Sequence, residues 1–389
     1  MRLQRRHIVQ TTVVLGLAVA LGGIAGRSFL AQRRPEPLYP APGLTRVLRL
    51  SEINPLLAGT RADTEVYVFA GAAPGASLLL LGGTHPNEFA AYLAAVILLE
   101  NLRVDAGTVY LVPRANASAA THTESQEAHP RFVAIGTPGG VRTFRHGARV
   151  TNPVDQWPDP EIYTHPTSGS LLAGNETRNL NRAYPGVRDG NLTERLAWAI
   201  TELIRREGID LAIDLHEAAP EYPVVNALVA SERSQEIASF ATLSLEMAGL
   251  DFALEPSPPG FRGLSHREWT DYTETRPFLL ETANPAQGRL RGRTDAALVL
   301  HGRDRQYLKA AGIGALAMPY DADGLPIELR VTRHLEAVAA ILEAHNLLDP
   351  ERPLLADGWP GREALMAEGV GAFLGGPAIR PQAGAAPDR

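Results

Sequence analysis

The chain has 389 residues, of which 45% are hydrophobic and 21% charged, with a formal net charge of −6; this is ordinary globular composition for one large or two smaller domains. It contains no cysteine, which excludes thiol nucleophiles, iron–sulfur clusters, thiolate zinc sites and disulfides, so any metal must be held by histidine and carboxylate side chains. No run of basic residues with interleaved aromatics follows residue 40, so nucleic acid is not an expected partner.

The N-terminal segment, residues 1–43, is expected to stand apart from the folded domain. Arginines precede an apolar stretch over 8–25, and a Pro-rich linker follows it, which is the pattern of a signal peptide or signal anchor. Cleavage after Ala25 and an uncleaved anchor both stay open, because about 18 apolar residues lie at the lower edge of what spans a bilayer. We therefore expect an exported protein, either periplasmic or anchored in the inner membrane and facing the periplasm. The alternative is a buried N-terminal helix.

The next part of the chain, 44–348, alternates short β-type runs with helical patterns, which predicts an α/β layer structure around a mixed or mainly parallel sheet. Strands are expected at 65–71, 77–83, 108–114, 210–216, 224–230 and 277–283. Helices are expected at 87–102, 193–208, 231–249 and 332–348, the second with Thr193 as its N-cap.

Two stretches show no such periodicity. Residues 116–177 are rich in Gly, Pro, Thr and His, and a loop of this length inside a compact domain is usually functional. Residues 349–389 are expected to form a C-terminal extension that is disordered from about residue 369, because the final stretch is rich in Gly, Pro and Ala.

A polar interruption follows the apolar run at 78–81. If a strand ends there and a helix begins at Pro86, a residue favoured at the first helical position, then His85 and Glu88 can point to the same side of the junction. A histidine and a carboxylate presented together make two-thirds of a three-ligand catalytic zinc site. The alternative is that His85 caps the helix and Glu88 interacts with its dipole.

Two later strands also end on polar residues. His216 closes an apolar strand, with Asp214 on the same face and able to orient its ring, whereas Glu217 points to the other side and ranks below the others as a ligand. Glu281 is the one carboxylate at the end of the strand over 277–283. Ligand sites in open α/β sheets lie outside the carboxyl ends of the strands, so these groups are expected to converge.

The motifs "GGTHPNE", "NLNRAYPG", "DLH" and "LLETA" resemble, in the same order, those of the succinylglutamate desuccinylase/aspartoacylase branch of the zinc carboxypeptidase superfamily. The resemblance spans roughly residues 78–285. It implies a three-layer, mixed, mostly parallel sheet with helices on both faces. Two departures are Pro86 in place of a glycine and Asn179 in place of an aspartate, which puts the supporting role of that aspartate in doubt.

The resemblance also implies roles for individual residues. One zinc ion per chain would be held by His85, Glu88 and His216, with Glu281 as general base. Substrate would be anchored by Asn181 and Arg182. The remaining substrate-binding arginine is one of Arg142, Arg145 and Arg178, and we take Arg145 as the first candidate.

These expectations together describe a zinc-dependent hydrolase that cleaves an amide or related acyl bond next to a carboxylate, as an N-acyl amino acid deacylase does. The partner would be a small molecule or a short peptide with a free carboxylate. One alternative is a periplasmic zinc carboxypeptidase acting on peptides or cell-wall fragments. The other is a non-catalytic zinc- or ligand-binding protein on the same fold, against which an intact Glu281 argues. The exact substrate and the oligomeric state do not follow from the sequence.

Overall fold

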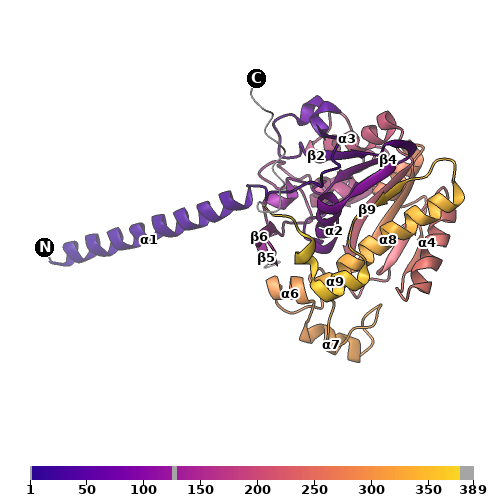
Figure 1. Ribbon diagram of the computed structural model, residues 1–389. Coiled ribbons are helices and arrows are strands. Elements are labelled where there is room, and N and C mark those ends of the chain that lie inside the picture. Colours follow the sequence, from indigo (N-terminus) through magenta and orange to yellow (C-terminus); the bar gives the residue numbers. More distant parts are fainter. Residues whose placement is uncertain (1, 125–128, 377–389) are drawn as a thin grey trace, which may run out of the picture.

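A mixed β-sheet runs through the centre of the domain (Figure 1). The computed structural model describes residues 2–124 and 129–376. Within them the sheet has nine strands in the order β1-β2-β4-β3-β9-β12-β10-β11, with β13 paired to β4. The strands are β1 (Arg46–Arg49), β2 (Glu65–Ala70), β3 (Ala73–Leu81), β4 (Arg103–Val112), β9 (Leu211–Ala218), β10 (Ala227–Ala230), β11 (Ala253–Pro256), β12 (Arg276–Ala283) and β13 (Leu355–Asp357).

The central strands β4, β3, β9 and β12 run parallel to one another, whereas the pairings β1–β2, β2–β4, β10–β12 and β13–β4 are antiparallel. Strands β3 and β9 are nearly continuous apolar runs, as expected for parallel strands covered on both faces. The three neighbouring strands β3, β9 and β12 therefore end side by side, with their carboxyl ends on the same side of the sheet.

Helices cover both faces of this sheet, and the side chains of β3 show how. Leu78 and Leu80 pack into a core cluster shared with α2, α4 and α8, whereas Leu79 and Leu81 pack into a second cluster shared with α3. The prediction of a three-layer α/β fold is confirmed (Figure 1). The helices are α1 (Arg2–Gln32), α2 (Phe89–Asn101), α3 (Leu192–Glu207), α4 (Gln235–Met247), α5 (Ser265–Tyr272), α6 (Ala296–His301), α7 (Arg305–Gly312), α8 (Ile327–Leu348) and α9 (Arg362–Glu368).

Each predicted strand and helix is present, although several ends differ: α4 begins at Gln235 rather than at residue 231, and α8 at Ile327 rather than at residue 332. The cap at the start of α3 also differs from the prediction. Asn191, not Thr193, is the N-cap: its side chain accepts a hydrogen bond from the backbone N–H of Glu194. The hydroxyl of Thr193 instead donates to Gln156 Oε1 at 2.7 Å. Both residue types suit a cap, and a partner from a distant loop decides between them.

The region over 116–177 contains short elements that the sequence pattern does not reveal. Two small hairpins lie there, β5 (Phe132–Thr137) with β6 (Gly140–Arg145) and β7 (Ile162–Thr164) with β8 (Leu171–Ala173). The 3₁₀ turns η3 (Ala119–Thr121) and η4 (Gly174–Arg178) flank them.

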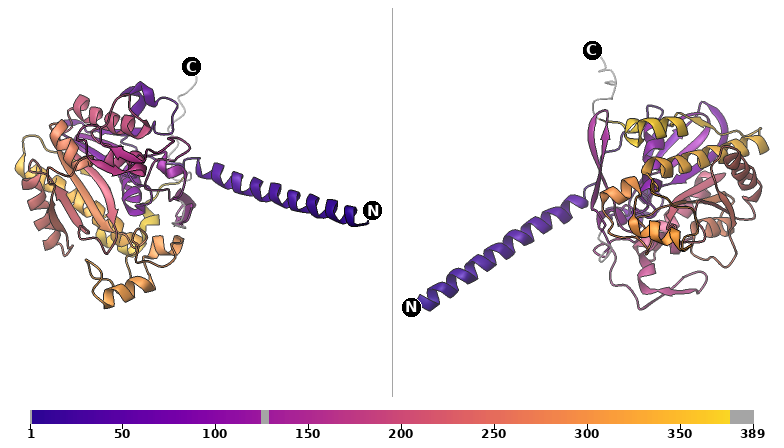
Figure 2. Two further views of the ribbon diagram at one scale, coloured as in Figure 1. Left: turned by 180° about the vertical axis from the view of Figure 1, so that it is seen from behind. Right: turned by 90° about the horizontal axis from the view of Figure 1, so that it is seen from below.

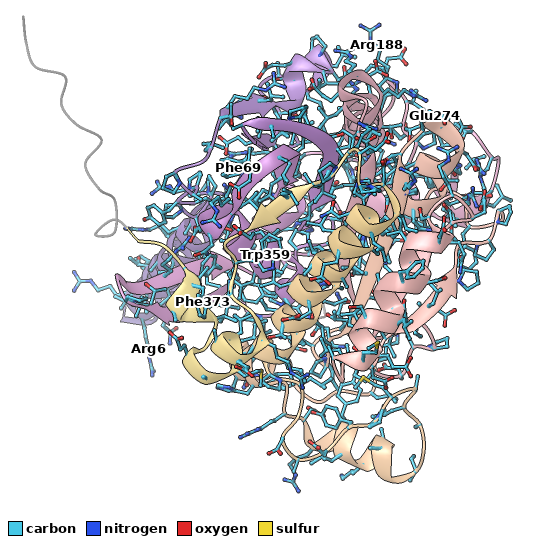
Figure 3. All side chains as sticks on the ribbon, turned by 45° about the vertical axis from the view of Figure 1, so that its right-hand side comes forward. Arg6, Phe69, Arg188, Glu274, Trp359 and Phe373 are labelled. Atoms are coloured by element: carbon cyan, nitrogen blue, oxygen red, sulfur yellow. The ribbon has the colours of Figure 1, made fainter. Side chains whose placement is uncertain are left out.

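The C-terminal part packs on the domain further than expected. After β13 and α9, the 3₁₀ turn η6 (Val370–Phe373) follows, and Leu365, Val370 and Leu374 are buried in the core. Trp359 and Phe373, labelled in Figure 3, pack against the same cluster. The expectation of disorder from about residue 369 is therefore wrong for residues 370–376, because their apolar side chains are buried. Residues 377–389 lie outside the described residues.

Helix α1 projects away from the domain in all views (Figures 1 and 2). Its residues Arg5–Gln32 are long and apolar enough to cross a membrane, and none of the most apolar window is buried. The alternative of a buried N-terminal helix is therefore wrong, and the segment fits a signal sequence or an anchor. The division of the chain at residues 43 and 348 stays a prediction.

Candidate metal centre

Three of the predicted site residues come together at the carboxyl ends of the parallel strands. His85 and Glu88 follow β3, and His216 lies in the neighbouring strand β9. One ligand atom from each lies within 4.8 Å of the others, and all three side chains are buried. Two imidazoles and one carboxylate are the donor set of a catalytic zinc site that keeps a further position open.

The local backbone of this site differs from the predicted helix start. Helix α2 begins at Phe89, so residues 85–88 form a turn that is closed by the N–H of Glu88 donating to the carbonyl of His85 at 2.9 Å. Gly83 precedes it with φ +64°, and a Cβ there would lie 2.8 Å from the carbonyl oxygen of Pro113. Only glycine fits this close approach without strain, and the turn then brings both side chains to the same side.

The carboxylate of Glu88 lies between the two imidazoles. Its Oε1 is 2.7 Å from Nδ1 of His85 and its Oε2 is 2.9 Å from Nδ1 of His216. Burial acts to raise the pKa of Glu88, but the two rings hold that pKa well below its usual range. Both Nδ1 atoms therefore face the same carboxylate, which suits them as the metal-binding atoms of the rings.

The far nitrogen of His85 has a partner that fixes the ring. Nε2 of His85 donates to Oδ1 of Asn179 at 2.9 Å, which leaves Nδ1 as the lone-pair atom. The amide Nδ2 of Asn179 donates in turn to Glu176 at 2.6 Å, and the backbone N–H of Asn181 donates to its Oδ1 at 3.0 Å. An asparagine at this position therefore supports the ring, and the doubt raised by the missing aspartate does not apply to that contact.

Asp214 supports the other side of the site from a fully buried position. It accepts hydrogen bonds from the hydroxyls of Thr84 and Ser265, each at 2.7 Å. Its Oδ2 also lies 2.9 Å from Nε2 of His216, close enough for an ion pair although the ring nitrogen lacks hydrogen-bond geometry. Despite burial, Asp214 and Glu88 raise the pKa of His216 well above its usual value.

Asn179→Ala should weaken zinc binding by about 10–100-fold, the usual effect of removing a partner that orients a metal-binding histidine. The ring of His85 would lose its acceptor at Nε2 while all three candidate ligands remain. Competition with a chromophoric chelator at fixed pH measures this affinity. Asn346→Ala is the matched control, because Asn346 hydrogen-bonds Leu354 in the C-terminal region. An affinity equal to that of the unmodified chain would contradict the supporting role of Asn179.

Glu281 lies beside the three candidate ligands on β12. Its Cα is the register partner of His216 in the parallel β9–β12 pair. Its Oε2 is buried without a hydrogen-bond partner among the described residues. Burial raises the pKa of Glu281 to about 8, and the charges of Glu88 and Asp214 act in the same direction while His216 opposes them. The side chain as a whole is half-buried, and a carboxyl group with one unpartnered oxygen and a raised pKa is suited to accept and return a proton.

Among the arginines, the structure brings a residue to the site that the sequence did not single out. Nη1 of Arg149 lies 3.2 Å from Oε1 of Glu88 and 3.3 Å from Nδ1 of His85. Arg182 follows Asn181 at the end of η5 (Leu180–Arg182), and its nearest carboxylate, on Glu176, is 4.0 Å away. Burial lowers the pKa of Arg182, and the charge of Arg149 lowers it further, so the two guanidinium groups lie close enough to repel.

The three other arginine candidates have structural partners instead. Arg145 is buried and its Nε lies 2.5 Å from Glu36. Arg142 forms an ion pair with Glu100 at 2.7 Å. Arg178 donates hydrogen bonds from Nε and Nη2 to the two carboxylate oxygens of Asp159. The structure therefore does not support Arg145 as a substrate-binding residue, because its guanidinium group is committed to a buried ion pair.

Glu217 lies on the other face of β9, as its place in the sequence predicts. Its carboxylate pairs with Arg330 at 3.0 Å and accepts the N–H of Ala90 at 2.8 Å, in the first turn of α2. It thereby connects β9, α2 and α8 and contributes to the packing that holds the turn at residues 85–88.

No family model matches the chain, and no curated protein matches it. Among solved structures, it is similar to the apo cell shape determinant protein Csd4 from Helicobacter pylori, with 14% identity and a TM-score of 0.46. It is also similar to a metallo-carboxypeptidase from Burkholderia cenocepacia, with 14% sequence identity and a TM-score of 0.44. A succinylglutamate desuccinylase from Silicibacter has 16% sequence identity and a TM-score of 0.38. These alignments cover 79%, 82% and 66% of this chain, and 59%, 68% and 65% of the respective neighbours.

The chain thus spans about 59% of the length of Csd4. Since every TM-score is below 0.5, the case for a function rests on the site itself.

Proposed function

We propose that this chain is a zinc-dependent hydrolase that cleaves an amide or related acyl bond next to a substrate carboxylate. His85, Glu88 and His216 would hold one zinc ion through two imidazole Nδ1 atoms and one carboxylate. The observation that carries the proposal is the buried, unpartnered Oε2 of Glu281 next to this donor set. A site that only stored a metal would have no use for such a carboxyl group.

A zinc ion in this position supplies a Lewis acid that acidifies bound water and polarises a carbonyl group. The protein residues supply the remaining functions. Glu281 takes a proton from the attacking water and returns it to the departing nitrogen or oxygen. Asn179 and Asp214 keep the two rings in place, so the donor set needs little rearrangement during turnover.

The two arginines define the class of substrate. A guanidinium group binds a carboxylate with a planar pair of hydrogen bonds, which a lysine does not provide. Within residues 2–124 and 129–376, no carboxylate lies closer than 4.0 Å to Arg182, and the side chain of Arg149 is 33% exposed. Unlike Arg145, both guanidinium groups are therefore partly exposed to an incoming anion, and N-acyl amino acids and short peptides both carry one.

A panel of substrates with the carboxylate free or amidated tests this assignment. Amidation should lower kcat/KM by about 10–100-fold, which corresponds to about 1.5–3 kcal/mol for a charge-assisted hydrogen bond. Arg182→Lys and Arg149→Lys should each erase much of this discrimination while the chain keeps its zinc. Arg188→Lys is the control, because Arg188 lies at the surface over the ring of Trp198 (Figure 3).

Equal hydrolysis of the free and amidated forms would contradict the anchoring role and favour a neutral ester or amide substrate. The same panel distinguishes between deacylase and carboxypeptidase activity of this chain. A preference for peptides over N-acyl amino acids would favour the carboxypeptidase alternative, which uses the same residues.

A further inference from the structure

We propose that the loop over 152–158 rests on the membrane that α1 crosses, with Trp157 at the level of the lipid headgroups. The inference uses α1 as a membrane anchor and does not depend on the reaction at the metal centre. It concerns how the domain is held relative to the bilayer.

The helix meets the domain through fixed contacts rather than through a free linker. Arg33, directly after α1, pairs with Asp155 at 2.9 Å, and the other oxygen of Asp155 accepts the hydroxyl of Ser118 at 2.6 Å. From a second part of the domain, Arg131 hydrogen-bonds Ser28 and places its guanidinium group 4.5 Å from the ring centre of Phe29. The last turn of α1 is therefore held between two parts of the domain.

The residues after the helix continue this attachment. Gln32 is fully buried, and Glu36 forms the buried ion pair with Arg145. The carbonyl oxygen of Arg33 accepts a hydrogen bond from Arg61 at 3.3 Å. Because polar and charged contacts fix residues 28–36, the orientation of α1 also fixes which surface of the domain faces the membrane.

Two large apolar side chains are exposed beside this attachment. Val154 is 77% exposed and Trp157 is 74% exposed, and they flank Asp155 in sequence. The loop that carries them is well supported: the side chain of Asn152 accepts the N–H of Val154, and Gln156 donates to the carbonyl of Thr177. Hydrogen bonds of the loop thus hold the backbone that exposes these two side chains.

The length of the helix places this loop close to the lipid. A hydrocarbon core of about 30 Å takes about 20 helical residues, and each headgroup layer adds about 5–8 Å, or about 3–5 residues. With Arg6 at the inner boundary, the outer headgroup layer falls at roughly residues 27–31. Arg33 and its partner Asp155 then lie within about one helical turn of that layer. Trp157 lies two residues further along the loop, and tryptophan is enriched at membrane–water interfaces.

The charged side chains near the end of α1 also favour contact with the membrane surface. Arg27, Arg34 and Arg61 are exposed next to this attachment, whereas the nearby carboxylates Glu36 and Asp155 are already paired with arginines. Exposed arginines beside apolar side chains favour contact with anionic headgroups.

This arrangement would keep the metal centre near the membrane. Arg149, which contacts Glu88, and the loop over 152–158 belong to one continuous segment that returns from the site toward α1. Substrates would then reach the site from the layer of the envelope next to the bilayer.

The test uses the full chain in vesicles of zwitterionic or anionic lipid whose acyl chains carry bromine, which quenches nearby tryptophan. The chain has four tryptophans, of which Trp269 is fully buried. Bromolipid should remove most of the emission that Trp157→Phe eliminates, with stronger quenching in the anionic vesicles. Trp359→Phe is the matched control and should leave the bromolipid-quenched part unchanged.

The proposal is overturned if the emission of Trp157 is insensitive to bromolipid and is quenched by aqueous iodide instead. If Trp157 is protected from both quenchers, and this protection rises with protein concentration, a second copy of the chain covers the loop. That result would also overturn the proposal. Carbonate extraction of the same vesicles reports on α1 alone, and metal analysis reports on the site. A failure of membrane docking is therefore distinguishable from a failure of the proposed function.

Discussion

His85→Ala and His216→Ala should each reduce bound zinc from about one ion per chain to a small fraction of that. Each change removes one of three protein ligands, and the buried carboxylate of Glu88 would keep only one imidazole beside it. Elemental analysis by mass spectrometry after exhaustive dialysis measures the metal content. The circular dichroism spectrum should stay close to that of the unmodified chain, because both side chains lie at the carboxyl ends of the strands.

A histidine outside the cluster provides the control for these variants. His301→Ala removes an exposed ring at the end of α6 and should leave the zinc content unchanged. Full zinc occupancy in both His85→Ala and His216→Ala would show that the ligand set has been assigned incorrectly.

Glu281→Gln should keep the zinc and the fold while lowering kcat by about 10²–10⁴-fold, the range expected when a general base is removed. The amide has nearly the same shape as the carboxyl group but cannot take a proton from water. Because the ligand atoms are unchanged, the metal content separates this effect from loss of the site. Single-turnover rates on the preferred substrate, with metal content measured on the same sample, give the comparison.

Glu274→Gln is the matched control for this variant, since Glu274 lies at the surface (Figure 3). If Glu281→Gln turned over substrate at the normal rate, another group would have to accept the proton. If it lost its zinc, Glu281 would be part of the metal site rather than the proton acceptor.

The sequence predicted that the candidate metal ligands lie close together, because these residues follow apolar strands. His85, His216 and Glu281 each come at or near the end of such a strand, and parallel strands bring their carboxyl ends together. The three-layer fold follows from the same runs, since strands that are apolar on both faces need helices on both sides.

The arginines could not be assigned in this way, because their partners lie far away in the chain. Arg145 differs from Arg149 only by what surrounds it: the first is 109 residues from its partner Glu36, and the second reaches the turn that holds Glu88. Both belong to a region without periodicity, so no pattern indicates which side chain points to the site. The packing of residues 370–376 was missed because the Gly, Pro and Ala content of the surrounding stretch is typical of disorder.

The separation of the ligands along the chain has a consequence for folding. Glu88 and His216 are 128 residues apart, so an unfolded chain cannot present the complete donor set to one ion. Zinc would then bind the native state far better than the unfolded ensemble, and its binding energy would add to the stability of the fold. At free zinc about 1,000-fold above its Kd this amounts to about 4 kcal/mol, a sizeable share of the stability of a typical domain. Because the chain has no cysteine, no disulfide restrains its unfolded state, and the metal would act as the cross-link between β3 and β9.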